Sequence, residues 1–131
     1  MTLFEIFALY VAINLVLAPI LMLRVGKQRL SKKVSLGDGG DATLLARIRA
    51  HGNFTENAPL LLIGLFALAS LSVLPVVLHI FGVAITLGRI LHAYGMMGKN
   101  ANGKGRGLGS MLTLLAYLGM AGTLIYKIIA G

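Results

Sequence analysis

The sequence predicts an all-α membrane protein, an up-and-down bundle of four transmembrane helices. Of its 131 residues, 57% are hydrophobic and only 12% are charged, and its mean hydropathy of +0.87 is far above that of a water-soluble domain. The apolar residues form long runs, and the basic residues lie between these runs. Since about 20 apolar residues suffice to cross a bilayer as a helix, we expect lipid to surround most of the molecule.

One domain, residues 1–131, is expected to hold all four spans. The expected spans cover residues 3–23, 43–73, 75–97 and 108–129. The first span carries Glu5 near its outer end and Asn14 at its middle, where a neighbouring helix could satisfy both side chains. No basic residue precedes this span and no small-residue cleavage pattern follows it, so we interpret it as a retained helix and not a signal peptide.

The second helix is predicted to be the longest. We expect it to begin near Thr43, with Asp41 or Thr43 as its N-cap, and to follow a loop over residues 26–43. At about 45 Å it would exceed a bilayer core, so its first turns would stand in the headgroup zone. Pro59 is expected to kink it. Pro75, a residue suited to the first helical position, begins the third span.

The net charge of +8 arises mainly in two connections, residues 24–42 and 98–107, and in the polar start of the second helix. With four spans the two connections lie on the same side, and the positive-inside rule places them in the cytoplasm with both termini outside. In a soluble protein this charge would suggest nucleic-acid binding. Beside membrane spans it is a topology signal, so we expect membrane lipid as a partner and no nucleic acid.

The densest polar cluster lies early in the second helix. At about 100° per residue, Arg49, Asn53 and Glu56 fall on one helical face. Ionisable residues at membrane depth usually face a cavity or one another. A cation, an amide and an anion in a row suit a zwitterionic or peptide-like ligand, because arginine binds a carboxylate bidentately. The alternative is an ion pair within the helix, between Arg49 and Glu56.

Two polar residues of the third span, Arg89 and His92, also share a helical face. Arg89 either points into the same cavity or stabilises the bundle by pairing with Glu56, and the more economical role for His92 is a hydrogen bond to backbone. His79, near the opposite surface, is interpreted as structural. The histidines are dispersed, no carboxylate stands at ligand spacing and cysteine is absent, so no metal site is expected.

The segment Arg49-Ala-His-Gly-Asn53-Phe-Thr-Glu56-Asn-Ala-Pro59 and the later segment Gly88-Arg89-Ile-Leu-His92-Ala-Tyr resemble the MAPEG family, the membrane-associated proteins in eicosanoid and glutathione metabolism. Together with the four spans, the resemblance covers essentially the whole chain. The short length and the Gly37-Asp-Gly-Gly40 loop are similar to the small bacterial branch of that family. The resemblance therefore implies a multi-pass protein of the bacterial inner membrane.

The resemblance also implies a homotrimer that binds glutathione between neighbouring subunits and takes a hydrophobic small molecule as second substrate. Carried over by position, the residues that would contact glutathione are Arg49, Asn53, Glu56, Arg89 and His92. Arg24, at the end of the first span, is a further candidate for a carboxylate contact. Arg106, near the start of the fourth helix, would be the catalytic cation, because a positive charge favours the nucleophilic thiolate. Lys104 could take its place.

Two positions depart from the family pattern. Gly52 stands where members often carry an arginine or another side chain, and Met96 stands where they often carry a tyrosine. Tyr94 is two residues from Met96 and points to another face, so it does not replace that tyrosine. The resemblance therefore implies no prostaglandin or leukotriene specificity.

The expected function is that of a glutathione-dependent transferase or peroxidase. One alternative is a small multidrug or proton transporter, although Asn14 stands where such transporters need a carboxylate and Glu56 is the nearest substitute. The other alternative is a family member that binds glutathione without catalysis.

Overall fold

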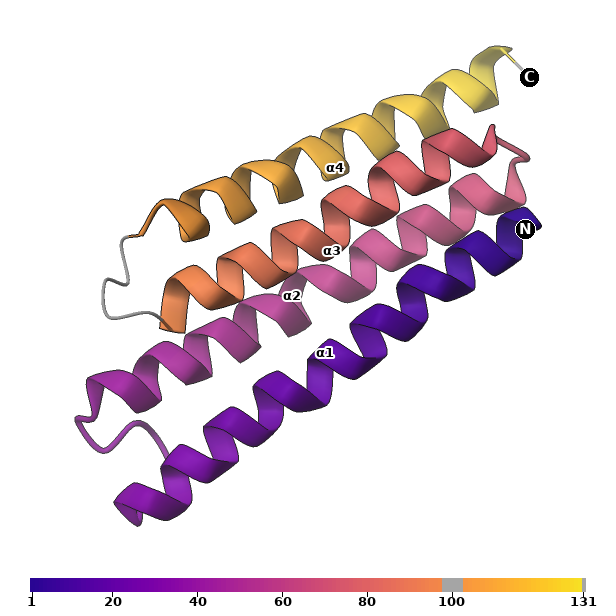
Figure 1. Ribbon diagram of the computed structural model, residues 1–131. Helices are drawn as coiled ribbons and strands as arrows, with labels where there is room; N and C mark the ends of the chain where they lie inside the picture. Colours follow the sequence, from indigo (N-terminus) through magenta and orange to yellow (C-terminus); the bar gives the residue numbers. More distant parts are fainter. Residues whose placement is uncertain (98–102, 131) are drawn as a thin grey trace.

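The computed structural model describes residues 1–97 and 103–130, and four long helices make up most of this part of the chain (Figure 1). They are α1 (Leu3–Lys32), α2 (Ala42–Ser70), α3 (Pro75–Met97) and α4 (Lys104–Ala130). The helices lie side by side, and both termini are at one end of the bundle. The ends of α1 and α3 and the starts of α2 and α4 lie at the other end. The predicted all-α, four-helix fold is confirmed.

Three helices, α1, α3 and α4, are long and apolar enough to cross a membrane. Helix α2 is long enough, with 29 residues, but its first half carries most of the predicted polar cluster. At about 44 Å it exceeds a bilayer core of about 30 Å, so its polar turns can extend beyond the hydrocarbon. Many large apolar side chains lie exposed on the outside of the bundle, as a lipid environment requires.

The first helix is longer than predicted. A loop was expected from residue 26, but α1 continues to Lys32 and ends where Lys33 adopts a left-handed conformation. The prediction was wrong because a loss of apolar character does not end a helix, and Lys, Gln and Arg are good helix formers. Gln28 Nε2 and Lys32 Nζ also reach Asp41, at 3.0 and 3.2 Å. The polar end of α1 is thereby tied to the start of α2.

The other helix ends follow the sequence more closely. Asp41 is the N-cap of α2 and accepts a hydrogen bond from Leu44 N at 2.6 Å. Pro75 is the first residue of α3, as predicted. Helix α4 begins at Lys104, four residues before the expected start of the span, so Arg106 lies in its first turn. Within the predicted connection 98–107, residues 98–102 lie outside the described part of the chain.

The interior contains two clusters of buried apolar side chains. The larger cluster joins all four helices toward the end with the termini and includes Ile6, Leu61, Leu78 and Met120. The smaller one lies toward the other end and consists of Leu21, Ala50, Phe54, Ala58 and Ala93. Polar contacts also join α1 to α3: Asn14 Nδ2 donates to Thr86 Oγ1 at 3.2 Å, and Tyr10 Oη lies 2.8 Å from His79 Nδ1.

Glycines let α3 and α4 approach closely. A Cβ at Gly95 would lie 2.9 Å from Arg106 Cα, and a Cβ at Gly109 would lie 2.6 Å from Gly88 O. Small residues at such crossings allow helix backbones in membranes to come into contact. The close contact fixes the backbone of Arg106 against the cytoplasmic end of α3, where the predicted site residues are found.

Candidate functional site

A pocket of about 340 Å³ opens between α2, α3 and α4 near their cytoplasmic ends. Its lining residues are Arg49, Asn53, His92, Met96, Arg106 and Ser110. Four of the residues singled out from the sequence, Arg49, Asn53, His92 and Arg106, therefore meet in one cavity. We call it the cytoplasmic pocket.

Each helix contributes to the cytoplasmic pocket by simple periodicity. On α2, Arg49 and Asn53 are one turn apart, and the adjacent Phe54 is buried in the smaller apolar cluster, which turns Asn53 toward α4. On α3, His92 and Met96 are likewise one turn apart. On α4, the contact between Gly95 and the Arg106 backbone brings the arginine to the mouth of the pocket.

Arg89 is almost completely buried, with 2% of its surface exposed, and it joins three helices. From α3 its Nη1 donates to Asn53 Oδ1 and, at 3.3 Å, to Asn53 O on α2, and its Nη2 donates to Thr113 Oγ1 on α4. The Thr113 hydroxyl in turn donates to Gly109 O at 2.7 Å. Arg89 thus holds the Asn53 side chain in place, in the role of a bundle-stabilising arginine.

The ion pairs considered from the sequence are not formed. Arg89 takes Asn53 and Thr113 as its partners, and within the described residues Glu56 pairs with neither Arg89 nor Arg49. Glu56 is exposed on α2 and does not line the cytoplasmic pocket. The Arg89 guanidinium donates to Asn53 and Thr113 on the two facing helices, so it does not require the carboxylate of the exposed Glu56.

A second cavity of about 210 Å³ continues from the first along the α2–α4 groove, toward the membrane interior. The two cavities share Asn53 and Ser110. In the second cavity Tyr117 Oη donates to Asn57 O at 3.2 Å, which links α4 to α2 one turn beyond Asn53. Arg89 and Thr113 also line this cavity. We call it the inner pocket because it lies toward the membrane interior.

The sequence reasoning missed the contribution of α4. Ser110, Thr113 and Tyr117 stand at positions i, i+3 and i+7 of this otherwise apolar helix, so they form one polar stripe. That stripe faces α2 and lines the inner pocket. The spacing of these three residues is visible in the sequence, but the predicted site included charged, amide and imidazole side chains and no hydroxyl-bearing residue.

Arg24 lies elsewhere. It lines a separate groove between α1 and α3, and its Nη1 is 3.7 Å from Met97 Sδ. Within one subunit the structure therefore does not bring Arg24 together with Arg49 and Arg106. Arg47, on the other side of α2, donates to Arg24 O at 3.1 Å and also lies away from the cytoplasmic pocket.

The cytoplasmic pocket is suited to a polar anion. Two guanidinium groups, those of Arg49 and Arg106, line it together with an amide, an imidazole and a hydroxyl, and none of the six lining residues is acidic. Guanidinium groups recognise carboxylates bidentately, and the amide can both donate and accept toward a peptide group. Its volume is in the range of small-molecule clefts, about 300–1,000 Å³.

The comparisons with known proteins identify the family of this chain. The MAPEG family model matches residues 7–126, which covers nearly all of the chain. The chain belongs to the MAPEG family. Two curated relatives, both named inner membrane protein YecN, from Escherichia coli strains K12 and O6:H1, are 31% identical over 88 residues, which is 67% of this chain and 67% of each relative. The family assignment made from the sequence is thus confirmed.

The similarity to YecN also bears on location. This MAPEG protein has three helices able to cross a membrane among its described residues, and its relatives are inner membrane proteins. It is a multi-pass protein of the bacterial inner membrane, as predicted. The orientation, with the cytoplasmic pocket at the basic end, follows from the distribution of lysine and arginine.

Proposed function

We propose that this MAPEG protein is a glutathione-dependent membrane transferase or peroxidase. The observation that carries the proposal is the cytoplasmic pocket, in which Arg49, Asn53, His92 and Arg106 converge. Glutathione presents two carboxylates, one ammonium group and two amides, and the pocket offers cations, an amide and a hydroxyl to these groups. Membership of the MAPEG family supports the same ligand.

In the proposed complex, Arg49 binds a glutathione carboxylate and Asn53, held by Arg89, bonds a peptide group. The protein works as a homotrimer in which glutathione lies between neighbouring subunits. Glu56, exposed on α2 one turn from Asn53, is then placed to take the ammonium group from the open side. A second subunit would close that side.

Arg106 is the proposed catalytic residue. Its positive charge beside the sulfur favours the thiolate, and the thiol proton passes to water. With an aryl halide, the thiolate forms a carbon–sulfur bond and halide leaves. With a hydroperoxide, the thiolate takes the distal oxygen and the alcohol leaves, after which a second glutathione reduces the sulfenic acid and yields disulfide and water. The hydrophobic substrate would reach the sulfur through the inner pocket from the lipid.

The test is conjugation of glutathione to a generic aryl halide by the detergent-solubilised protein. We expect Arg106→Ala to lower kcat about 100-fold or more, as loss of a group that stabilises developing charge does, while glutathione affinity stays within several fold. Arg47→Ala is the matched control, because it removes an arginine that lies outside the pocket. Glutathione binding without any turnover in the wild-type protein would favour the non-catalytic alternative.

A further inference from the structure

We propose that the groove between α1 and α3 is a binding site for one anionic phospholipid of the cytoplasmic leaflet, with Arg24 at its headgroup. The site is separate from the cytoplasmic pocket and does not depend on the proposed glutathione chemistry. The groove has a volume of about 150 Å³. Its lining residues are Leu17, Ile20, Leu21, Arg24, Ile90, Ala93, Tyr94 and Met97.

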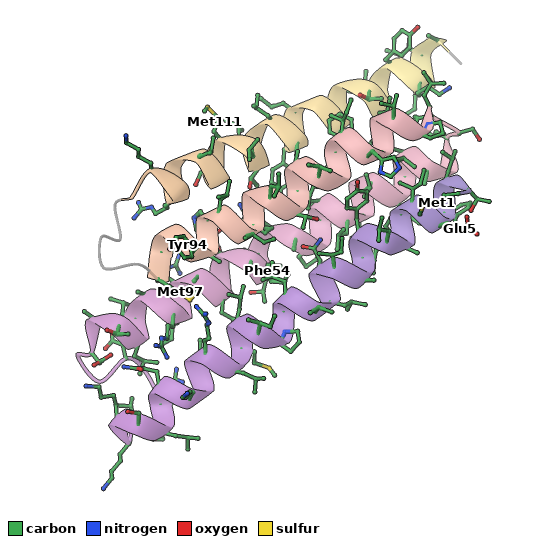
Figure 2. The ribbon with its side chains drawn as sticks, in the orientation of Figure 1. Met1, Glu5, Phe54, Tyr94, Met97 and Met111 are labelled. Atoms are coloured by element: carbon green, nitrogen blue, oxygen red, sulfur yellow. The ribbon has the colours of Figure 1, made fainter. Side chains whose placement is uncertain are left out.

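The groove lies at the depth where a phospholipid changes from acyl chain to headgroup. Arg24 is 21 residues beyond Leu3, about 32 Å along α1, which matches a hydrocarbon core of about 30 Å. The apolar lining residues of α1 lie one to two turns before Arg24, inside the hydrocarbon. Figure 2 shows Tyr94 and Met97 toward the end of α3 that is opposite to Met1 and Glu5.

Within the part of the chain that the structure describes, Arg24 has hydrogen-bond donors that are not used. Its guanidinium carries five N–H donors, and the partner it has within the described residues is Met97 Sδ at 3.7 Å, a weak acceptor. Tyr94 is 74% exposed beside it, with a hydroxyl that can donate to a phosphate or ester oxygen. A tyrosine at this depth is typical of the membrane interface. Together the two side chains can hold a phosphate group.

The surrounding charge selects a headgroup with net negative charge. Arg47 Nη1 donates to Arg24 O at 3.1 Å, so a second guanidinium lies beside the Arg24 backbone. A zwitterionic headgroup would bring its own cation toward these groups. Basic pockets between membrane helices on the cytoplasmic side bind anionic headgroups for this reason.

The test is native mass spectrometry of the full-length, detergent-solubilised protein, with phosphatidylglycerol or phosphatidylcholine of identical acyl chains. We expect one phosphatidylglycerol per chain, retained about tenfold more strongly than phosphatidylcholine. Arg24→Ala should weaken its retention about tenfold or more, because it removes charge-assisted hydrogen bonds, and Arg24→Lys should restore part of it. Lys27→Ala, which removes an exposed charge from the same helix, should change retention by no more than about threefold.

A second variant tests the acyl part of the site with the charge unchanged. Ile20 is 46% exposed in the groove, so Ile20→Trp can fill it without entering the core, and we expect phosphatidylglycerol retention to fall about tenfold. Equal loss in Lys27→Ala and Arg24→Ala would overturn the proposal in favour of diffuse attraction. Equal retention of both lipids, or displacement by soluble glycerol phosphate at the same concentration as lipid, would overturn it as well.

Discussion

Replacement of Thr113 by valine tests whether Arg89 stabilises the bundle through the three-helix contact. Valine has nearly the shape of threonine, so the change removes the hydroxyl and leaves the packing in place. Arg89 Nη2 then loses its acceptor on α4, at a site where Arg89 is 2% and Thr113 6% exposed. Among the described residues Arg89 Nε has no hydrogen-bond partner, so little can compensate for the loss.

The expected cost follows from the type of hydrogen bond. Hydrogen bonds to charged groups contribute about 1.5–3 kcal/mol, and loss of one partner leaves the other unsatisfied. Because the inner pocket borders Arg89 and can admit water, we expect the lower part of this range. Thr113→Val should therefore reduce the free energy of unfolding by about 2 kcal/mol, a factor of about 30 in the equilibrium.

Thr123 provides a matched control on the same helix. Its hydroxyl donates to Gly119 O at 2.7 Å, as that of Thr113 donates to Gly109 O, but Thr123 has no arginine partner among the described residues. Thr123→Val should cost no more than about 0.5 kcal/mol. The assay is equilibrium unfolding of the detergent-solubilised protein followed by circular dichroism. Equal costs for the two variants would refute the proposed role of Arg89.

Two further predictions concern the helix contacts that support the site. Gly95→Ala should destabilise the protein by about 1–3 kcal/mol in the same assay, because the new Cβ meets the Arg106 backbone. Gly107→Ala is the control: there is open space around Gly107, so the change should be neutral or stabilising by up to about 1 kcal/mol. Equal effects of the two variants would contradict the close contact of α3 and α4. The hydrogen bond from Leu44 N, followed by those from Gln28 and Lys32, lowers the pKa of Asp41. Its contribution to stability is thus present above the ordinary aspartate pKa of about 3.9 and is lost as pH falls through the lower folded value. The thermal midpoint of the wild type should therefore exceed that of Asp41→Asn at neutral pH, since Asn keeps the cap but not the charge. The difference should shrink as pH falls below the ordinary aspartate pKa, and a difference that does not vary with pH would contradict this.

Most of the fold was predictable because one strong signal dominates the sequence. Long apolar runs identify membrane helices, and Asp41 and Pro75 mark helix starts by simple local chemistry. The signal fails where a helix leaves the membrane. Residues 26–32 of α1 and the first turn of α4 at Lys104 are polar but helical, because hydrophobicity reports the environment of a helix and not its length.

The candidate site was predictable in part. The spacing of Arg49 and Asn53 placed them on one face, and the structure shows that face in the cytoplasmic pocket. Partner choice was not predictable, because it depends on which helices face each other. Arg89 donates a hydrogen bond to Thr113 and not to Glu56, because the glycine-mediated contact brings α4 close to α3. Arg24 lines the groove between α1 and α3, because of the position of α1.

Isothermal titration calorimetry tests most directly whether the cytoplasmic pocket binds glutathione. The detergent-solubilised wild-type protein should give a saturating binding heat with glutathione at millimolar concentration or below. Arg49→Ala should weaken the affinity about 10- to 100-fold, as loss of charged hydrogen bonds to a carboxylate requires, and Arg47→Ala should not. No binding heat at millimolar glutathione, or equal affinity of wild type and Arg49→Ala, would contradict the account.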